Sequence, residues 1–190
     1  MAVIVYIESD EGIIKKGALE VISYGRAVAD DQELSLIGVA FNLKKFDLLN
    51  SYGIDKLYNI DNKENHFFNV ESYCDTLADI FKKENCRIGV ISSSADCRYL
   101  GPSLSIKTDA SYISNVVALP LQYNPLKLRR SCFTNKAFNQ TESLNHKTII
   151  SISSNSFGLK EKHRKLEVLT SNFLHSSNGL RVTSVNKITD

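Results

Sequence analysis

No run of apolar residues in this 190-residue sequence is long enough to cross a lipid bilayer. The apolar segment 2–7 is short, and it lacks the basic region that opens a signal peptide. The N-terminus is not rich in arginine and poor in acid, as a transit peptide would be. We therefore expect a protein with no membrane span and no recognisable targeting segment.

A strong net charge is also missing. The formal net charge is only +2 at pH 7, and the basic residues are scattered along the chain. Proteins that bind nucleic acid or an anionic membrane usually concentrate lysine and arginine in one patch. The sequence therefore disfavours both kinds of partner.

The cysteines form no CxxC pair and no spacing typical of metal ligands. They are Cys74, Cys86, Cys97 and Cys132. Buried free thiols in a reducing cytoplasm are the simplest interpretation. We expect no disulfide framework, and we assign no metal-binding residue.

The known phosphate-binding motifs GxGxxG and Walker A do not occur in the sequence. The segment from Ser92 to Asp96 nevertheless lies where a predicted strand ends and a helix begins, which is where phosphate binds in many α/β proteins. Serine and aspartate are also common helix caps. A nucleotide contact and a cap both stay open, and the cap is favoured. In the loop after the first strand, Asp10 and Glu11 precede Gly12, and their charge would repel a phosphate.

Catalytic constellations are absent as well. The histidines are far apart in polar surroundings, and none has an acid or nucleophile at motif spacing: His66, His146, His163 and His175. A Cys–His hydrolase would have to pair Cys97 or Cys132 with one of them, and no motif supports such a pair. We assign no catalytic residue and expect a protein that is not an enzyme.

Two neighbouring arginines alternate with apolar residues on a predicted strand, so Arg129 or Arg130 should face inward or into an interface. A buried guanidinium needs carboxylates or carbonyls as partners. An exposed edge strand protected by charge is an equally consistent reading. Asn135, Asn139 and Asn155 lie near the same segment, and we expect them to be candidates for hydrogen bonds across an interface.

Short apolar stretches alternate with amphipathic segments over the first 120 residues. Strands are predicted at 2–7, 34–40, 56–60, 87–91 and 111–119, with helices near 18–28, 43–51, 70–83 and 97–107. Asn69 is the expected N-cap of the third helix, and Pro102 is compatible with the fourth only near its first turn. This alternation predicts an α/β fold with a doubly wound, mostly parallel sheet, because five such units are too few to close a barrel.

The pattern changes after Pro120. Residues 127–133, 136–143 and 148–153 look like consecutive strands without helices between them, which predicts an antiparallel, β-rich C-terminal extension at one sheet edge. From Lys160 onward the chain is polar. Residues 180–185 form a last extended segment that we interpret as the entry to a further domain.

Several segments together resemble the alpha subunit of electron transfer flavoproteins. They are Val3 to Glu8, Tyr52 to Leu57, Ser92 to Asp96, Tyr99 to Pro102, Tyr112 to Val117, Phe133 to Phe138 and Asn155 to Gly158. The resemblance covers nearly the whole chain and implies an adenine nucleotide alpha hydrolase-like fold. It also implies a bacterial, cytoplasmic scaffold domain that packs against a beta subunit.

In that family the complete heterodimer carries FAD. It shuttles electrons from flavin dehydrogenases, such as acyl-CoA dehydrogenases of fatty acid beta-oxidation, to a quinone reductase. The family holds FAD with a Ser-Gly-Gly-Arg-Gly and a Gly-Gln-Thr-Gly sequence, and neither occurs here. The resemblance therefore implies an N-terminal domain at 1–158, a linker at 159–190 toward a missing FAD-binding domain, and AMP only in the beta subunit. We assign no cofactor-binding residue.

A second function remains open on the residues alone. A stand-alone adenine-nucleotide-binding module of the universal stress or hydrolase-like type shares this architecture, and the Ser92 loop would be its site.

Overall fold

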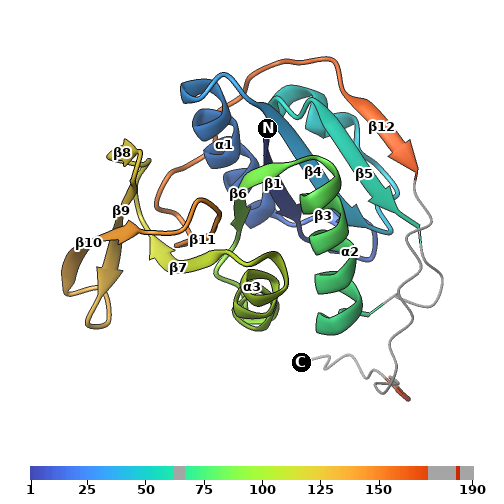
Figure 1. Cartoon of the computed structure of the whole chain (residues 1–190). Helices are drawn as coiled ribbons and strands as arrows, with labels where there is room; N and C mark the ends of the chain where they lie inside the picture. Colours follow the sequence, from blue (N-terminus) through green and yellow to red (C-terminus); the bar gives the residue numbers. More distant parts are fainter. Residues whose placement is uncertain (62–66, 171–182, 185–190) are drawn as a thin grey trace.

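The computed structural model describes residues 1–61, 67–170 and 183–184. These residues form a ten-stranded sheet and a separate two-stranded hairpin (Figure 1). In spatial order the sheet contains β10 (Ala137–Ser143), β9 (Leu126–Cys132), β7 (Ser111–Val116), β11 (Thr148–Ile152), β6 (Cys86–Ile91), β1 (Ala2–Ile7), β4 (Ser35–Phe41), β5 (Lys56–Ile60) and β12 (Glu167–Thr170). A short β8 (Gln122–Tyr123) pairs with β9, and β2 (Ser9–Asp10) with β3 (Ile13–Ile14) makes the hairpin.

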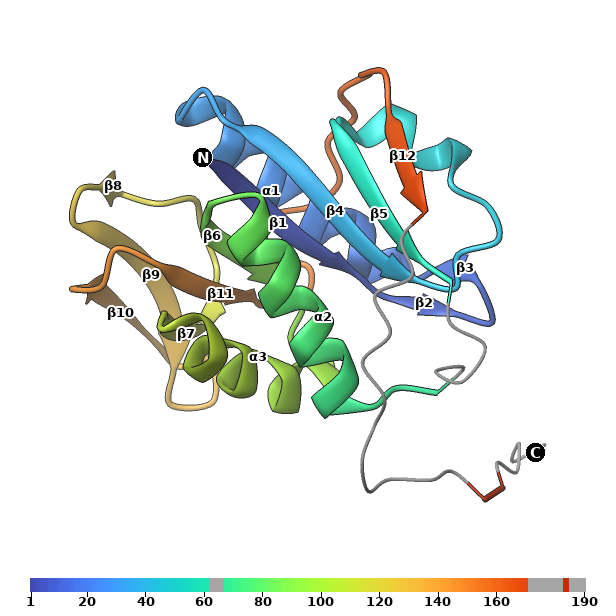
Figure 2. The same cartoon turned by 45° about the vertical axis from the view of Figure 1, so that its right-hand side comes forward.

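The sheet is parallel from β7 to β12, and only the pairs that involve β9 are antiparallel. Helix α1 (Lys16–Asp31) and the 3-10 helix η1 (Asp47–Tyr52) cover one face. Helices α2 (Val70–Lys83) and α3 (Ala95–Thr108) cover the other (Figure 2). The predicted doubly wound α/β fold is therefore confirmed.

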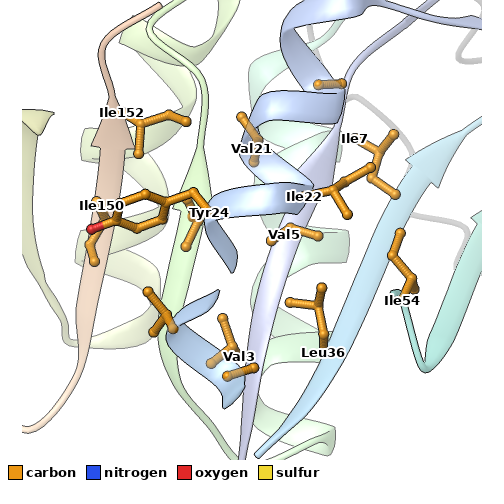
Figure 3. Packing of buried hydrophobic residues seen from close by; sticks show 14 of the residues in the cluster. Val3, Val5, Ile7, Val21, Ile22, Tyr24, Leu36, Ile54, Ile150 and Ile152 are labelled. Atoms are coloured by element: carbon orange, nitrogen blue, oxygen red, sulfur yellow. The ribbon is translucent and has the colours of Figure 1, made fainter. Parts of the chain in front are cut away.

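Strand β1 lies at the centre of this sandwich and is buried on both faces, as its uninterrupted apolar sequence predicts. Val3, Val5 and Ile7 contribute to the core under α1, where they meet Val21 and Ile22 of the helix (Figure 3). The alternate residues of β1 contribute to the second core, under α2 and α3. Both cores thus depend on this strand.

The helix over residues 70–83 forms as predicted. The side chain of Asn69 accepts hydrogen bonds from the backbone N–H groups of Glu71 and Ser72, so it is the N-cap. Lys82 and Lys83 lie in the last turn, where a positive charge suits the helix dipole.

The expectation that Pro102 lies near the start of a helix is wrong. Helix α3 begins at Ala95 and continues past Pro102, which stands in its middle. The residue before a proline normally resists the helical conformation because its Cβ meets the proline ring. Gly101 has no Cβ, and a Cβ built there would come within 2.5 Å of the Tyr112 ring. Glycine therefore permits both the proline and the close packing of α3 on β7.

The antiparallel extension is confirmed for two of its three predicted strands. β9 and β10 form an antiparallel hairpin beyond β7. The strand predicted at 148–153 belongs elsewhere, because β11 is parallel and lies between β7 and β6. All five of its residues are buried, and they serve both cores, Ile149 in one and Ile150 and Ile152 in the other. Burial on both faces is a property of an interior strand rather than of an edge.

The chain continues to pack against the same α/β unit after residue 158. A segment that we call the strap, residues 159–166, passes α1 and η1 and leads to β12 at the opposite edge (Figure 1). Backbone hydrogen bonds from Lys162 to Ser51 and from Arg164 to Asn50 hold it. The domain division at 158 stays a prediction, and most of the extended segment 180–185 lies outside the described residues.

A buried arginine reinforces the strap. The Arg26 guanidinium donates to Asp55 and to the Gly53 carbonyl oxygen, and it forms an ion pair with Asp30 at 3.0 Å. Arg164 of the strap reaches the same Asp55 with an N–O distance of 3.3 Å. Charge pairing thus joins α1, the start of β5 and the strap.

Candidate functional site

The topology of the sheet defines the position at which α/β proteins of this architecture bind ligands. From β1 the sheet continues through β4 and β5 in one direction and through β6 in the other. The chain therefore reverses its winding between β1 and β6, and the carboxyl ends of these two strands lie at the switch point. Glu8 follows β1 there, and Ser92 follows β6.

A buried carboxylate lies at this switch point. Glu8 is 4% exposed, and its Oε2 accepts a hydrogen bond from the Ser92 hydroxyl. Its Oε1 accepts no hydrogen bond within the described residues, and the Lys15 ammonium stands 3.6 Å away. A negative charge at this position opposes an incoming phosphate. The sequence signal for Glu8 is an acidic residue that directly follows six apolar ones. The prediction for this loop considered only Asp10 and Glu11 and did not include Glu8.

The loop from Ser92 to Asp96 forms a helix cap. The Ser94 hydroxyl accepts from the Cys97 backbone N–H at 3.2 Å, as an N-cap does. The Ser92 hydroxyl accepts from the Ser94 backbone N–H at 3.1 Å. The cap interpretation is thus confirmed, and the hydroxyl of Ser92 also serves Glu8.

The segment with Asp10, Glu11 and Gly12 is a tight turn between β2 and β3. Glu11 and Gly12 both have positive φ, 50° and 85°, the combination that a two-residue hairpin turn of type I′ requires. A Cβ on Gly12 would lie 2.7 Å from the Lys44 side chain. The glycine is therefore explained by the turn and by the packing against it.

A second buried carboxylate lies under the loop that follows β11. Glu20 of α1 is 6% exposed and accepts hydrogen bonds from the backbone N–H groups of Asn155, Phe157 and Gly158 at 2.8, 2.8 and 3.0 Å. Burial opposes its ionisation, but the hydrogen bonds from these backbone N–H groups outweigh burial and lower the pKa of Glu20. Of these residues, the sequence analysis singled out only Asn155, as a candidate for a hydrogen bond across an interface. No sequence pattern indicated Glu20.

The two arginines of β9 separate as expected, because Arg130 is half-buried and Arg129 is exposed. The Arg129 guanidinium stacks 4.1 Å from the centre of the Phe138 ring on β10. Arg130 donates to the Ser114 hydroxyl at 3.2 Å, and its buried Nε has no hydrogen-bond partner in the described ranges. The expected carboxylate or carbonyl partner of a buried guanidinium is therefore replaced by a hydroxyl.

Hydrolase chemistry finds no support among the described residues. His146 and His163 are exposed, and His66 and His175 lie outside the described ranges. Burial raises the pKa of the Cys97 thiol to about 11, so this thiol is protonated at neutral pH.

No group of three or more histidine, cysteine or acidic side chains suited to a metal ion occurs in the described part of the chain. Within the same ranges, no helix is both long and apolar enough to pass through a membrane.

Comparison with known proteins identifies relatives of this chain. The family profile described as "Electron transfer flavoprotein domain" matches residues 3–172. "Acryloyl-CoA reductase electron transfer subunit beta" of Anaerotignum propionicum is 26% identical over 123 residues, which cover 63% of this chain and 34% of that protein. "Protein FixB" of Clostridium saccharobutylicum is 23% identical over 120 residues, which cover 62% of this chain and 36% of that protein. The matched region thus spans about a third of the length of these curated relatives.

Proposed function

The chain belongs to the electron transfer flavoprotein family, and from this premise we propose that it is the N-terminal α/β domain of an alpha-type subunit. In this role the domain is a scaffold of a cytoplasmic electron carrier and not an enzyme. It packs against a beta subunit and seats a following domain that holds FAD. The complete heterodimer carries electrons from flavin dehydrogenases, such as acyl-CoA dehydrogenases, to a quinone reductase.

The observation that carries the choice of subunit is the Glu8 carboxylate between β1 and β6. In our proposal AMP belongs to the beta subunit, whose domain has a related fold. A chain with a buried carboxylate at the switch point is poorly suited to a phosphate group, because the two negative charges repel each other. One relative is named a subunit beta and the other FixB. The proposal therefore rests on the residues rather than on these names.

The switch point is poorly suited to the pyrophosphate of FAD. The Glu8 carboxylate lies at this point, whereas a pyrophosphate needs N–H donors or a glycine-rich turn. No flavin contact and no electron-transfer step is therefore assigned to the residues that the structure describes. The flavin supplies the redox chemistry of such a carrier, and this domain supplies position.

The β9–β10 hairpin is the surface that we assign to the partner subunit. It forms the edge of the sheet opposite β12 (Figure 1). Phe133 in its turn is 79% exposed, and Phe138 on β10 is 59% exposed. Exposed aromatic side chains beside arginine are typical of protein interfaces.

A visible absorption spectrum tests this proposal. The chain would be purified alone and after mixing with the neighbouring beta subunit. We expect no flavin absorption from the chain alone and a stable complex on mixing. Flavin bound to the chain alone would place the site within these residues and would overturn the assignment of FAD to another domain.

A stand-alone adenine-nucleotide-binding module is the second candidate, and the switch point beside the capped N-terminus of α3 is the observation in its favour. Isothermal titration with AMP and ATP distinguishes the two. Stoichiometric binding by the unaltered chain would support the module. Binding that occurs only in a Glu8→Gln variant would show that the carboxylate excludes the nucleotide, as the main proposal requires.

A further inference from the structure

The loop at residues 155–158 surrounds an oxyanion with backbone donors. Three N–H groups converge on the two oxygens of the Glu20 carboxylate. The donors lie 135 to 138 positions from Glu20 in the sequence, so the arrangement is not a local cap. Successive N–H groups that point to one side form the concave sites that bind anions in many proteins.

The backbone conformation of the loop creates this concavity. Asn155 and Gly158 have positive φ values of 58° and 81°, and these residues flank Ser156 and Phe157. Left-handed residues among right-handed or extended ones turn neighbouring N–H groups toward a common point. The donors are backbone groups, so the site depends on the path of the chain and not on any one side chain.

Contacts that do not involve Glu20 hold the loop in place. The Phe157 ring packs edge-on against Tyr24 with ring centres 5.4 Å apart. The Ser23 hydroxyl accepts from the Lys160 backbone N–H at 3.0 Å, and the Lys160 ammonium lies 4.4 Å from the centre of the Phe157 ring. The conformation of the loop at residues 155–158 should therefore persist when the carboxylate is removed.

We propose that residues 155–158 form a carboxylate-binding site whose built-in ligand is the side chain of Glu20. The site selects a planar group with two oxygens, because two donors address Oε1 and one addresses Oε2. In the intact protein it is closed to solutes and fastens the loop to α1. When the side chain is shortened, it accepts formate or acetate from solution.

Rescue by formate tests this site. The full chain would be compared with Glu20→Ala and with Glu161→Ala, which removes an exposed glutamate of the strap. Thermal unfolding would be followed in formate, acetate, phosphate and chloride at equal ionic strength. We expect formate to stabilise only Glu20→Ala, in a saturable way, with the ratio of folded to unfolded protein rising roughly tenfold at ten times the formate dissociation constant. Equal responses of all three proteins, or no saturable response, would overturn the proposal.

A second variant covers the case in which Glu20→Ala does not fold. Recovery of the fold on addition of formate would support the site. Without such recovery, Glu20→Gln keeps the volume of the side chain but directs amide hydrogens at some of the donors. Hydrogen exchange at Asn155, Phe157 and Gly158 should then be faster than in the unaltered chain. Unchanged exchange at these three amides would contradict the proposal.

Discussion

At the scale of single residues, the interior contains acidic groups that are bonded to specific donors. Glu8 accepts from Ser92, and Glu20 accepts from a loop more than 130 residues away. A buried carboxylate without such partners would cost several kcal/mol. Glu8 therefore fixes the position of β1 relative to the loop after β6, and Glu20 fixes the position of α1 relative to the loop after β11.

Stability should depend on pH through Glu20. Its pKa is lowered in the folded protein, so it stabilises the fold above the ordinary glutamate pKa of about 4.3. That contribution is lost as the pH falls through the lowered value. We predict that Glu20→Gln reduces the free energy of unfolding by about 1.5–3 kcal/mol at neutral pH, since hydrogen bonds to a charged group are removed.

Urea denaturation at neutral pH and in acid measures this effect. The difference between Glu20→Gln and the unaltered chain should shrink in acid. A control variant, Glu161→Gln, should behave like the unaltered chain at both pH values, because its side chain is exposed. A difference of equal size at both pH values would show that the charge of Glu20 does not stabilise the fold.

At the scale of elements, α2 shows how a local pattern and the core agree. Its cap, its apolar stripe and its basic last turn are all encoded within residues 69–83. The stripe packs into the core under α2 and α3, where Leu77 is 1% exposed. Packing of this face, more than helix propensity, is what stabilises such a helix.

Shortening Leu77 to alanine should leave a cavity in that core. We predict a loss of about 2–5 kcal/mol in the free energy of unfolding, the range for deletion of a buried leucine side chain. Lys82→Ala, on the exposed side of the same helix, serves as the control and should change stability little. A Leu77→Ala protein as stable as this control would mean that the packing of α2 differs from the structure.

At the scale of the whole molecule, the two edges of the sheet differ. One edge ends in β12, which the strap leads into. The other ends in the β9–β10 hairpin, with Phe133 and Phe138 exposed. Apolar side chains gathered on an exposed surface commonly mark a site where another protein binds.

The isolated domain should therefore self-associate or bind a hydrophobic dye. A variant with Phe133→Ser and Phe138→Ser should show weaker dye fluorescence and less association, because each phenylalanine buries roughly 150–250 Å² when covered. Analytical ultracentrifugation and dye titration measure both effects. A strictly monomeric chain that does not bind the dye would count against the hairpin as a partner surface.

Some features of this protein follow from residues that are neighbours in the chain. The apolar run of β1 indicates a strand buried on both faces, and residues 69–83 specify a capped helix. Gly53 ends η1 in the left-handed conformation, as a glycine after a helix predicts. These patterns suffice for the fold class, because alternating strands and helices admit few other architectures.

Other features depend on contacts between residues far apart in the chain, and no local pattern indicates them. β11 follows a hairpin in the sequence but inserts between β7 and β6, and Pro102 is tolerated within α3 because Gly101 packs on Tyr112. The meeting of Glu20 with residues 155–158 has no local signal at all. Such contacts are fixed when two segments far apart in the chain bury their surfaces together and their polar groups must find partners, and no short stretch of sequence contains that information.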